Sequence, residues 1–237
     1  FGDRFGQIAK NFGAQVTMLS FNEGEAVQID SLRNALAADK DIKAVLVTHN
    51  ETNTGVTNDL ESISEVVKGE FDKLLLVDGI SSLCSVPLKT DDWGCDVVIS
   101  ASQKGWMLPP GLAFISFSER AWTAYSESNM PKFYFDLAQY RKYFKIGQPP
   151  YTPGLSVIYA LDLALDNILN EGMGKIFDRH TQIGKFTRNS IRSLGLSIFP
   201  QENVASNTVT AVKSPENLDA TKLIAKLRDV DNIILSG

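Results

Sequence analysis

Four short runs of apolar and β-branched residues constrain the fold of this chain more than any other feature of its sequence. The runs lie at residues 43–48, 73–78, 96–100 and 112–117. Each is continuous rather than alternating in its apolar character, which is typical of strands buried on both faces of a sheet. We therefore expect these four runs to form strands of the protein core.

The segment between the first two runs has the pattern of a helix. Asn58 begins a cap-like sequence with an acid three residues on, and Ile63, Val66 and Val67 follow at helical spacing until Gly69. A strand, a helix and a second strand in succession form a right-handed parallel unit. The sequence therefore predicts an α/β fold with a mostly parallel central sheet and flanking helices.

The second part of the chain is organised differently. Pro and Gly residues interrupt any regular element at 147–154. A long amphipathic helix is predicted to follow and to end near Gly172, with an apolar stripe made of Val157, Ile158, Leu161, Leu165, Ile168 and Leu169. A second helix is predicted over residues 175–194.

Beyond Gly195 the pattern becomes a strand at 208–212, a helix at 219–228 and a strand at 232–235, as in a small α+β domain. We therefore divide the chain into a large α/β domain (1–154), connecting helices (155–194) and the start of a small C-terminal domain (195–237). The chain opens without Met and ends soon after an apolar run. We expect it to be an internal fragment, truncated at both ends.

Charge and cysteine content exclude several classes of protein. Lysine and arginine total 23 against 28 acids, for a net charge of −5, and no basic stripe suited to nucleic acid is present. No apolar run approaches the ~20 residues of a membrane span. Cys84 and Cys95 are too few for a disulfide framework and cannot supply the cysteine pairs of a metal or iron–sulfur centre. We expect no metal site and a reducing, cytoplasmic location.

Asp78 and Lys104 are the residues with the clearest chemical potential. Asp78 ends the second run, and Lys104 follows the third, so both should face the crevice at the carboxyl ends of parallel strands. A deprotonated lysine amine condenses with carbonyls to a Schiff base, and a carboxylate can keep the pyridine nitrogen of pyridoxal phosphate protonated. From spacing alone a second interpretation stays open, in which Asp78 caps a helix and Lys104 lies in a solvated loop.

Several sequence blocks resemble those of class V aminotransferases of PLP fold type I, and of the alanine–glyoxylate and serine–glyoxylate (serine–pyruvate) branch in particular. The blocks are Val-Asp-Gly-Ile-Ser-Ser at 77–82, Asp-Trp-Gly-Cys-Asp-Val at 92–97, Ser-Gln-Lys at 102–104 and Pro-Pro-Gly at 109–111. The segments 49–55 and 149–153 are also similar to family blocks. The resemblance implies the PLP-dependent transferase fold and pyridoxal 5′-phosphate as cofactor.

The resemblance also implies roles for residues at matching positions. Lys104 would hold the cofactor as a Schiff base and shuttle the proton between the substrate α-carbon and C4′. Asp78 would bind the pyridine nitrogen, Ile80 would pack on the ring face, Thr52 would lie near the phenolic oxygen, and Gln103 would contact the phosphate. For Ile80 an ordinary core position is an equal alternative.

Thr152 lies in a block from which relatives reach the phosphate bound by the neighbouring subunit, and Tyr151 is its companion. These positions imply a homodimer with shared active sites. Without the family, residues 149–153 would be interpreted as a rigid turn between two elements. The phosphate loop, the aromatic that stacks on the cofactor and the arginine that binds the substrate carboxylate in relatives all fall outside this chain.

The function implied is ping-pong transfer of an amino group from alanine or serine to glyoxylate or pyruvate. Two alternatives stay open: another class V PLP enzyme, with lyase or desulfurase-like chemistry, and a non-catalytic α/β binding or assembly subunit. Desulfuration is disfavoured, because Gln103 stands where desulfurases carry a histidine before the lysine. We assign no catalytic role to His49, since a lone histidine after an apolar strand is more often structural.

Overall fold

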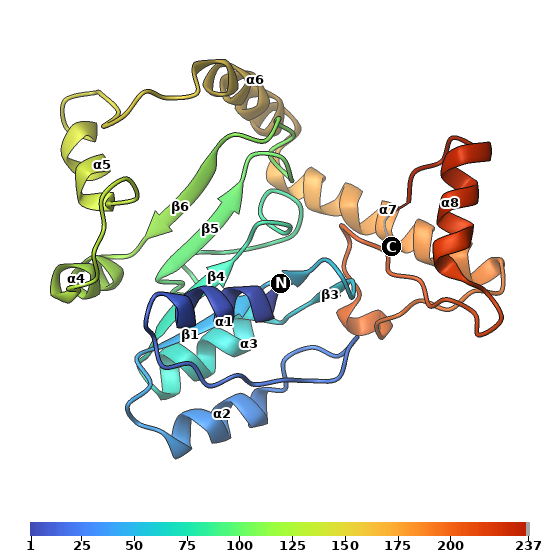
Figure 1. Cartoon of the computed structure of the whole chain (residues 1–237), viewed down its shortest axis with the longest axis horizontal. Helices are drawn as coiled ribbons and strands as arrows, with labels where there is room; N and C mark the ends of the chain where they lie inside the picture. Colours follow the sequence, from blue (N-terminus) through green and yellow to red (C-terminus); the bar gives the residue numbers. More distant parts are fainter. Residues whose placement is uncertain (236–237) are drawn as a thin grey trace.

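A four-stranded sheet forms the centre of the computed structural model, which describes residues 1–235 (Figure 1). The strand order is β1-β4-β5-β6, with β1, β4 and β5 parallel and β6 antiparallel to β5. The strands are β1 (Ala44–Thr48), β4 (Leu74–Asp78), β5 (Val97–Ala101) and β6 (Ala113–Phe117). The predicted α/β fold with a mostly parallel sheet is confirmed.

The prediction that all four strands are buried on both faces is wrong for β6. Ile115 in its middle is 48% exposed, whereas Leu75 and Val77 of β4 are fully buried. Ile115 is more exposed because β6 lies at the edge of the sheet and has one neighbouring strand, while β4 lies between two.

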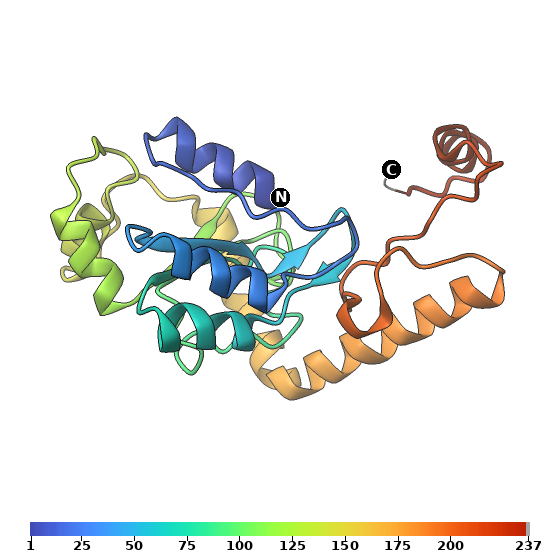
Figure 2. The ribbon, with the colours of Figure 1, turned by 90° about the horizontal axis from the view of Figure 1, so that it is seen from below.

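Helices cover both faces of the parallel part of the sheet. Figure 2 shows α1 (Gly2–Asn11) on one side and α3 (Leu60–Ser64) on the other. A π-helical turn, η1 (Glu65–Glu70), continues α3 and packs with α2 (Ile29–Ala38). Apolar side chains of α2, α3 and η1 form one core cluster with β1 and β4. The predicted helix is confirmed, with its cap one residue later than expected: the Asp59 carboxylate accepts a hydrogen bond from the Ser62 amide.

The C-terminal half is mainly helical. Its elements are α4 (Glu119–Glu127), α5 (Leu137–Phe144), α6 (Leu155–Glu171), α7 (Met173–Ser193), η2 (Glu202–Val204) and α8 (Ala220–Val230). The two long helices predicted after the Pro-rich break are α6 and α7, and Gly172 ends α6 with φ of 84°. A two-stranded hairpin, β2 (Asn50–Glu51) with β3 (Val56–Thr57), follows β1.

The strands predicted at 208–212 and 232–235 are wrong. Val212 forms only an isolated bridge with Ile198, and residues 232–235 have no regular structure. Apolar runs become strands where successive residues pair with a neighbouring strand. Residues 208–212 lie beside 197–199 but pair with that segment through this one bridge, and among the described residues 232–235 form no bridge. The end of the predicted C-terminal unit, residues 236–237, lies outside the described residues, and the three-part division stays a prediction.

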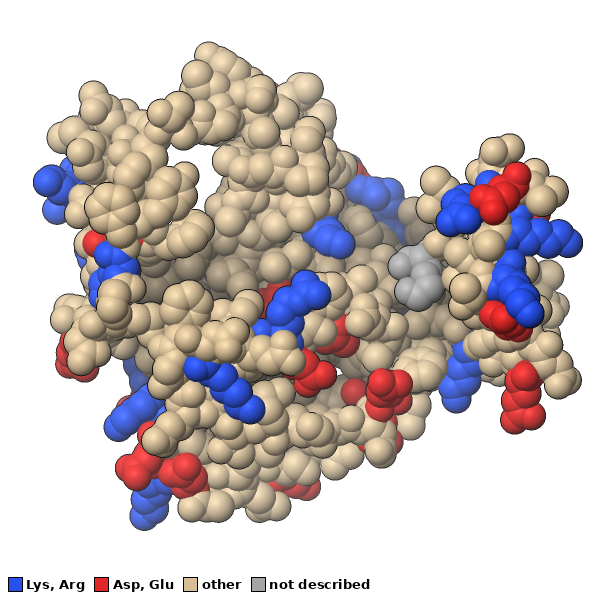
Figure 3. Space-filling model, in the orientation of Figure 1, with Lys and Arg blue, Asp and Glu red and all other residues tan. Residues whose placement is uncertain are grey.

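Basic and acidic side chains are mixed on the face drawn in Figure 3, and the region of α6 carries almost no charged side chains. Along α6, Leu155, Tyr159 and Leu163 are exposed by 58%, 75% and 64%. Within residues 1–235 no helix has both the length and the apolar character needed to cross a bilayer.

Candidate active site

Asp78 ends β4 at the carboxyl edge of the sheet, between Thr48 of β1 and Ile99 of β5. Its side chain is buried, and Oδ1 accepts a hydrogen bond of 2.9 Å from the Ile80 amide. Burial raises the pKa of the Asp78 carboxyl above its ordinary value. No basic side chain among the described residues forms an ion pair with it. A buried carboxylate without a cation is costly, so this position suits a ligand that supplies positive charge.

Lys104 lies in the loop that joins β5 to β6. The Met107 amide donates to the Lys104 carbonyl at 2.9 Å, and the Leu108 amide donates to the Ser102 carbonyl at 3.1 Å, so the loop is closed by its own backbone. The side chains of Lys104 and Gln103 are exposed. Exposure leaves the Lys104 amine accessible to a ligand that enters from the carboxyl edge of the sheet.

Gly105 allows the Lys104 loop to pack closely against the segment that follows Asp78. A Cβ at this position would lie 2.3 Å from the Leu83 carbonyl oxygen and 2.7 Å from the Ser85 hydroxyl oxygen. Trp106 ties the loop to the end of β5, because its Nε1 donates to the Ser100 hydroxyl at 3.0 Å. Sequence reasoning missed both residues, although they lie one and two residues after the lysine that it did identify.

The turn that carries Thr52 lies at the same edge of the sheet. It joins β2 to β3 and is closed by a 2.9 Å hydrogen bond from the Gly55 amide to the Glu51 carbonyl, and Thr52 itself is half-buried. The His49 amide donates to the Asp78 carbonyl at 3.0 Å, which keeps the chain after β1 beside the end of β4. Thr52, Ile80 and Lys104 therefore lie in three loops that leave neighbouring parallel strands at one edge (Figure 1).

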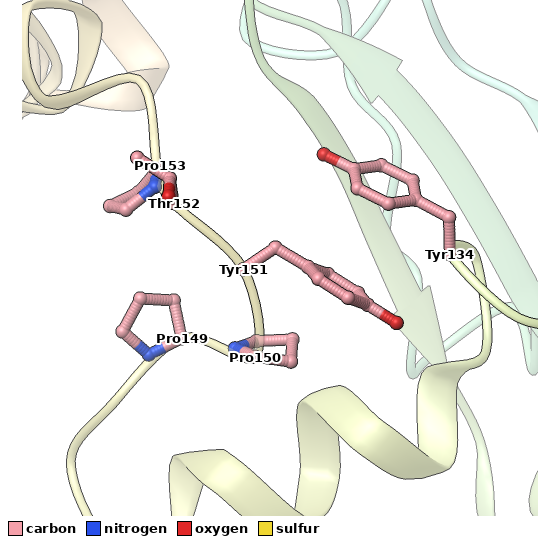
Figure 4. Close-up of a pocket in the computed structure, with 6 residues that line it drawn as sticks. All are labelled: Tyr134, Pro149, Pro150, Tyr151, Thr152 and Pro153. Carbon is pink, nitrogen blue, oxygen red and sulfur yellow. The ribbon is translucent and has the colours of Figure 1, made fainter.

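Tyr151 and Thr152 lie apart from that edge, between α5 and α6. They line an open pocket with Tyr134 and three prolines (Figure 4). The rings of Tyr134 and Tyr151 are stacked at 4.6 Å, and the Tyr151 hydroxyl donates to the Phe133 carbonyl at 3.1 Å. Within the described chain no hydrogen bond joins Tyr151 or Thr152 to Asp78 or Lys104. Hydrogen bonding therefore does not join the two groups within the described part of one chain.

The remaining titratable candidates are buried and uncharged. Burial lowers the pKa of His49 to about 4, and Nδ1 of its ring has no hydrogen-bond partner among the described residues. Burial raises the pKa of the Cys84 and Cys95 thiols to about 11, and the two belong to different core clusters. Residues 1–235 contain no group of three or more His, Cys, Asp or Glu side chains that could hold a metal.

A polar cluster that sequence reasoning missed joins the carboxyl edge to the C-terminal part of the chain. Asn50, which is 2% exposed, donates to the hydroxyls of Ser81 and Thr208. Asn50 and Ser81 stand in the sequence blocks quoted above, so a motif pointed to both. Nothing in the sequence indicated Thr208, because it lies 158 residues from Asn50.

A family model described as "Aminotransferase class-V" matches residues 5–237. Among curated proteins, the chain is 40% identical over its whole length to "Soluble hydrogenase, small subunit" from Synechococcus sp., of which it covers 62%. It is 38% identical to "Serine--glyoxylate aminotransferase" from Arabidopsis thaliana, over 91% of this chain and 55% of that protein.

Among solved structures, the alanine–glyoxylate aminotransferase from Nostoc sp. is similar with a TM-score of 0.94 at 30% sequence identity. The match covers 99% of this chain and 63% of that one. This chain therefore spans between 55% and 63% of the length of these three relatives.

Proposed function

This chain belongs to the aminotransferase class-V family, and on that premise we propose that it carries the cofactor site of an aminotransferase acting on small amino and 2-oxo acids. Family membership implies pyridoxal 5′-phosphate as the cofactor. The observation that carries the proposal is the buried Asp78 carboxyl, which forms no ion pair with a basic side chain of residues 1–235. Asp78 ends β4, and Lys104 lies in the loop that follows the neighbouring parallel strand β5. The amino donor is alanine or serine, and the acceptor is glyoxylate or pyruvate.

The residues present fit this cofactor. Asp78 offers a buried carboxylate to a cationic ring nitrogen, and the Lys104 amine is accessible at the same edge. When bound, the protonated pyridine ring withdraws electrons from the bonds of the substrate α-carbon. Lys104 holds the cofactor covalently when no substrate is bound, and afterwards moves a proton between the substrate α-carbon and C4′.

Three further residues position the cofactor in this proposal. Ile80 packs on one face of the ring while its amide holds the Asp78 carboxylate. Thr52 lies near the phenolic oxygen, at the tip of the turn between β2 and β3. Gln103 precedes Lys104 and contacts the phosphate.

We further propose a homodimer in which Thr152, with Tyr151 beside it, contacts the phosphate held by the partner subunit. The exposed apolar residues of α6 and the pocket of Figure 4 support this arrangement, since large exposed apolar surfaces mark interfaces. Mixed dimers of Lys104→Ala and Thr152→Ala chains provide the test. If the sites are shared, each mixed dimer contains one intact site, and activity returns on mixing two inactive proteins.

The central experiment is borohydride reduction of the full-length enzyme with its cofactor, followed by peptide mapping. We expect one cofactor adduct, on Lys104, and loss of both adduct and transamination in Lys104→Ala. The matched control is Lys89→Ala, which removes another exposed lysine near the site and should change neither. Product release without an added 2-oxo acid would contradict transamination and favour a lyase.

A second candidate is a non-catalytic assembly subunit. It is favoured by one observation, the 40% identity to a protein named as a soluble hydrogenase subunit. A full-length protein that never binds pyridoxal phosphate would support it. The cytoplasmic location expected from the unpaired cysteines stays a prediction.

A further inference from the structure

Three side chains from distant parts of the chain, Asn50, Ser81 and Thr208, form a hydrogen-bonded cluster that we call the clasp. The Asn50 Nδ2 atom donates to the Ser81 hydroxyl at 2.9 Å and to the Thr208 hydroxyl at 3.1 Å. The Ser81 hydroxyl donates back to the Asn50 carbonyl at 2.7 Å. The Thr208 hydroxyl also lies 3.3 Å from the Ser81 carbonyl, to which it can donate. The clasp therefore joins the chain after β1, the chain after β4 and the C-terminal segment.

The C-terminal segment 205–208 also holds the turn that carries Thr52. The Ser206 amide donates to the Gly55 carbonyl at 2.7 Å, and Ala205 forms a bridge with Val56 of β3. One short segment thus contacts two of the loops that carry the proposed cofactor residues (Figure 1). Among the described residues beyond Thr208, none forms a backbone hydrogen bond with either loop, although Ala211 lies close to Gly55.

The segment is itself anchored to α7 by a buried arginine. Arg188 is 3% exposed; it donates to the Ser206 carbonyl at 2.9 Å and to the Glu202 carboxylate at 3.0 Å. The guanidinium also lies within 3.4 Å of the Asn207 amide oxygen. Because Arg188 hydrogen-bonds to Glu202, Ser206 and Asn207, it anchors the residues that precede Thr208 to α7.

We propose that the clasp aims the Asp78 carboxylate at the cofactor ring, and that Thr208 is a positioning residue for that site. The inference rests on the proposed function. Ser81 is three residues after Asp78, and between them the Ile80 amide holds the carboxylate through Oδ1. Fixing Ser81 from two sides therefore fixes the backbone that orients Asp78. The dependence is steep, because a misplacement of about 1 Å at a reacting centre can cost about 100-fold in rate.

The test compares three substitutions in the full-length apoenzyme by titration with pyridoxal 5′-phosphate. Thr208→Val keeps the side-chain volume but loses the hydroxyl, and should weaken cofactor affinity about tenfold. Thr208→Ser keeps the hydroxyl and should bind as the parent does. Thr210→Val is the matched control, because the same change falls on a threonine two residues further along, whose hydroxyl forms no hydrogen bond with the described residues.

A double-mutant cycle with Asp78→Asn tests whether Thr208→Val lowers cofactor affinity by misplacing the Asp78 carboxylate or by loosening the fold in general. If the clasp acts through Asp78, Thr208→Val should cost little further affinity once the carboxylate is gone. An unchanged affinity in Thr208→Val, an equal loss in Thr210→Val, or full additivity with Asp78→Asn would each overturn the clasp while leaving the proposed function intact. Failure of the parent protein to bind the cofactor at all would overturn both.

Discussion

Replacing Gly105 by alanine is a direct test of how the Lys104 loop is held. The added Cβ would lie 2.3 Å from the Leu83 carbonyl oxygen. Carbon and oxygen atoms of neighbouring chains approach to about 3.3 Å at closest, so the loop or the 83–85 segment must move by about 1 Å. Neither side yields easily, because the obstacle is backbone and the loop is closed by its own hydrogen bonds.

We expect two consequences for Gly105→Ala. Overpacking of this kind lowers the free energy of unfolding by about 1–3 kcal/mol. A shift of about 1 Å in the lysine should lower kcat/KM for transamination by about 100-fold. Urea unfolding followed by circular dichroism measures the first effect, and steady-state kinetics of the full-length enzyme measures the second.

The matched control for this substitution is Gly174→Ala in α7. An added methyl group there meets no atom within 4 Å, and alanine favours a helix over glycine. The control should retain parental activity with stability unchanged or slightly raised. If Gly105→Ala behaved like the control in both assays, the close packing of the two loops would be refuted.

Three further predictions concern buried groups outside the loops. Burial lowers the pKa of His49 from 6.5 to about 4, so between these pH values the unfolded chain binds a proton that the folded chain does not. The free energy of unfolding should therefore fall, by at most about 3 kcal/mol, as the pH drops from 6.5 to about 4. Urea titrations at several pH values should show this pH dependence, and His49→Gln should reduce it. Arg188→Ala should lower the free energy of unfolding by about 3 kcal/mol, because it leaves the Ser206 carbonyl without its buried donor, and Arg192→Ala on the exposed side of Glu202 should cost less than about 1 kcal/mol. Cys84 and Cys95 should resist alkylation at pH 8 until the protein is unfolded, because burial raises both pKa values to about 11; rapid native-state labelling would contradict their burial.

Local pattern in the sequence was sufficient for most of the secondary structure. The apolar runs at 43–48, 73–78 and 96–100 become parallel strands, and Gly172 separates two helices as expected. The same patterning failed at 208–212, which pairs with 197–199 through a single bridge and forms no extended ladder. How far a segment pairs with its neighbour depends on the tertiary structure and is not contained in the local pattern.

The candidate site also contains some features that the sequence predicted and others that only the structure showed. The alternation of strands and helices by itself determined that Asp78 and Lys104 lie at one edge of the sheet, since parallel strands end on the same side. Only the tertiary structure showed that Gly105 packs against a carbonyl oxygen and that Thr208 hydrogen-bonds to Asn50. It also showed that Asp78 is buried and forms no ion pair with a basic side chain among the described residues. The periodicity of side chains is a property of a few successive residues, whereas contact, burial and charge balance depend on which distant segments the folded chain brings together.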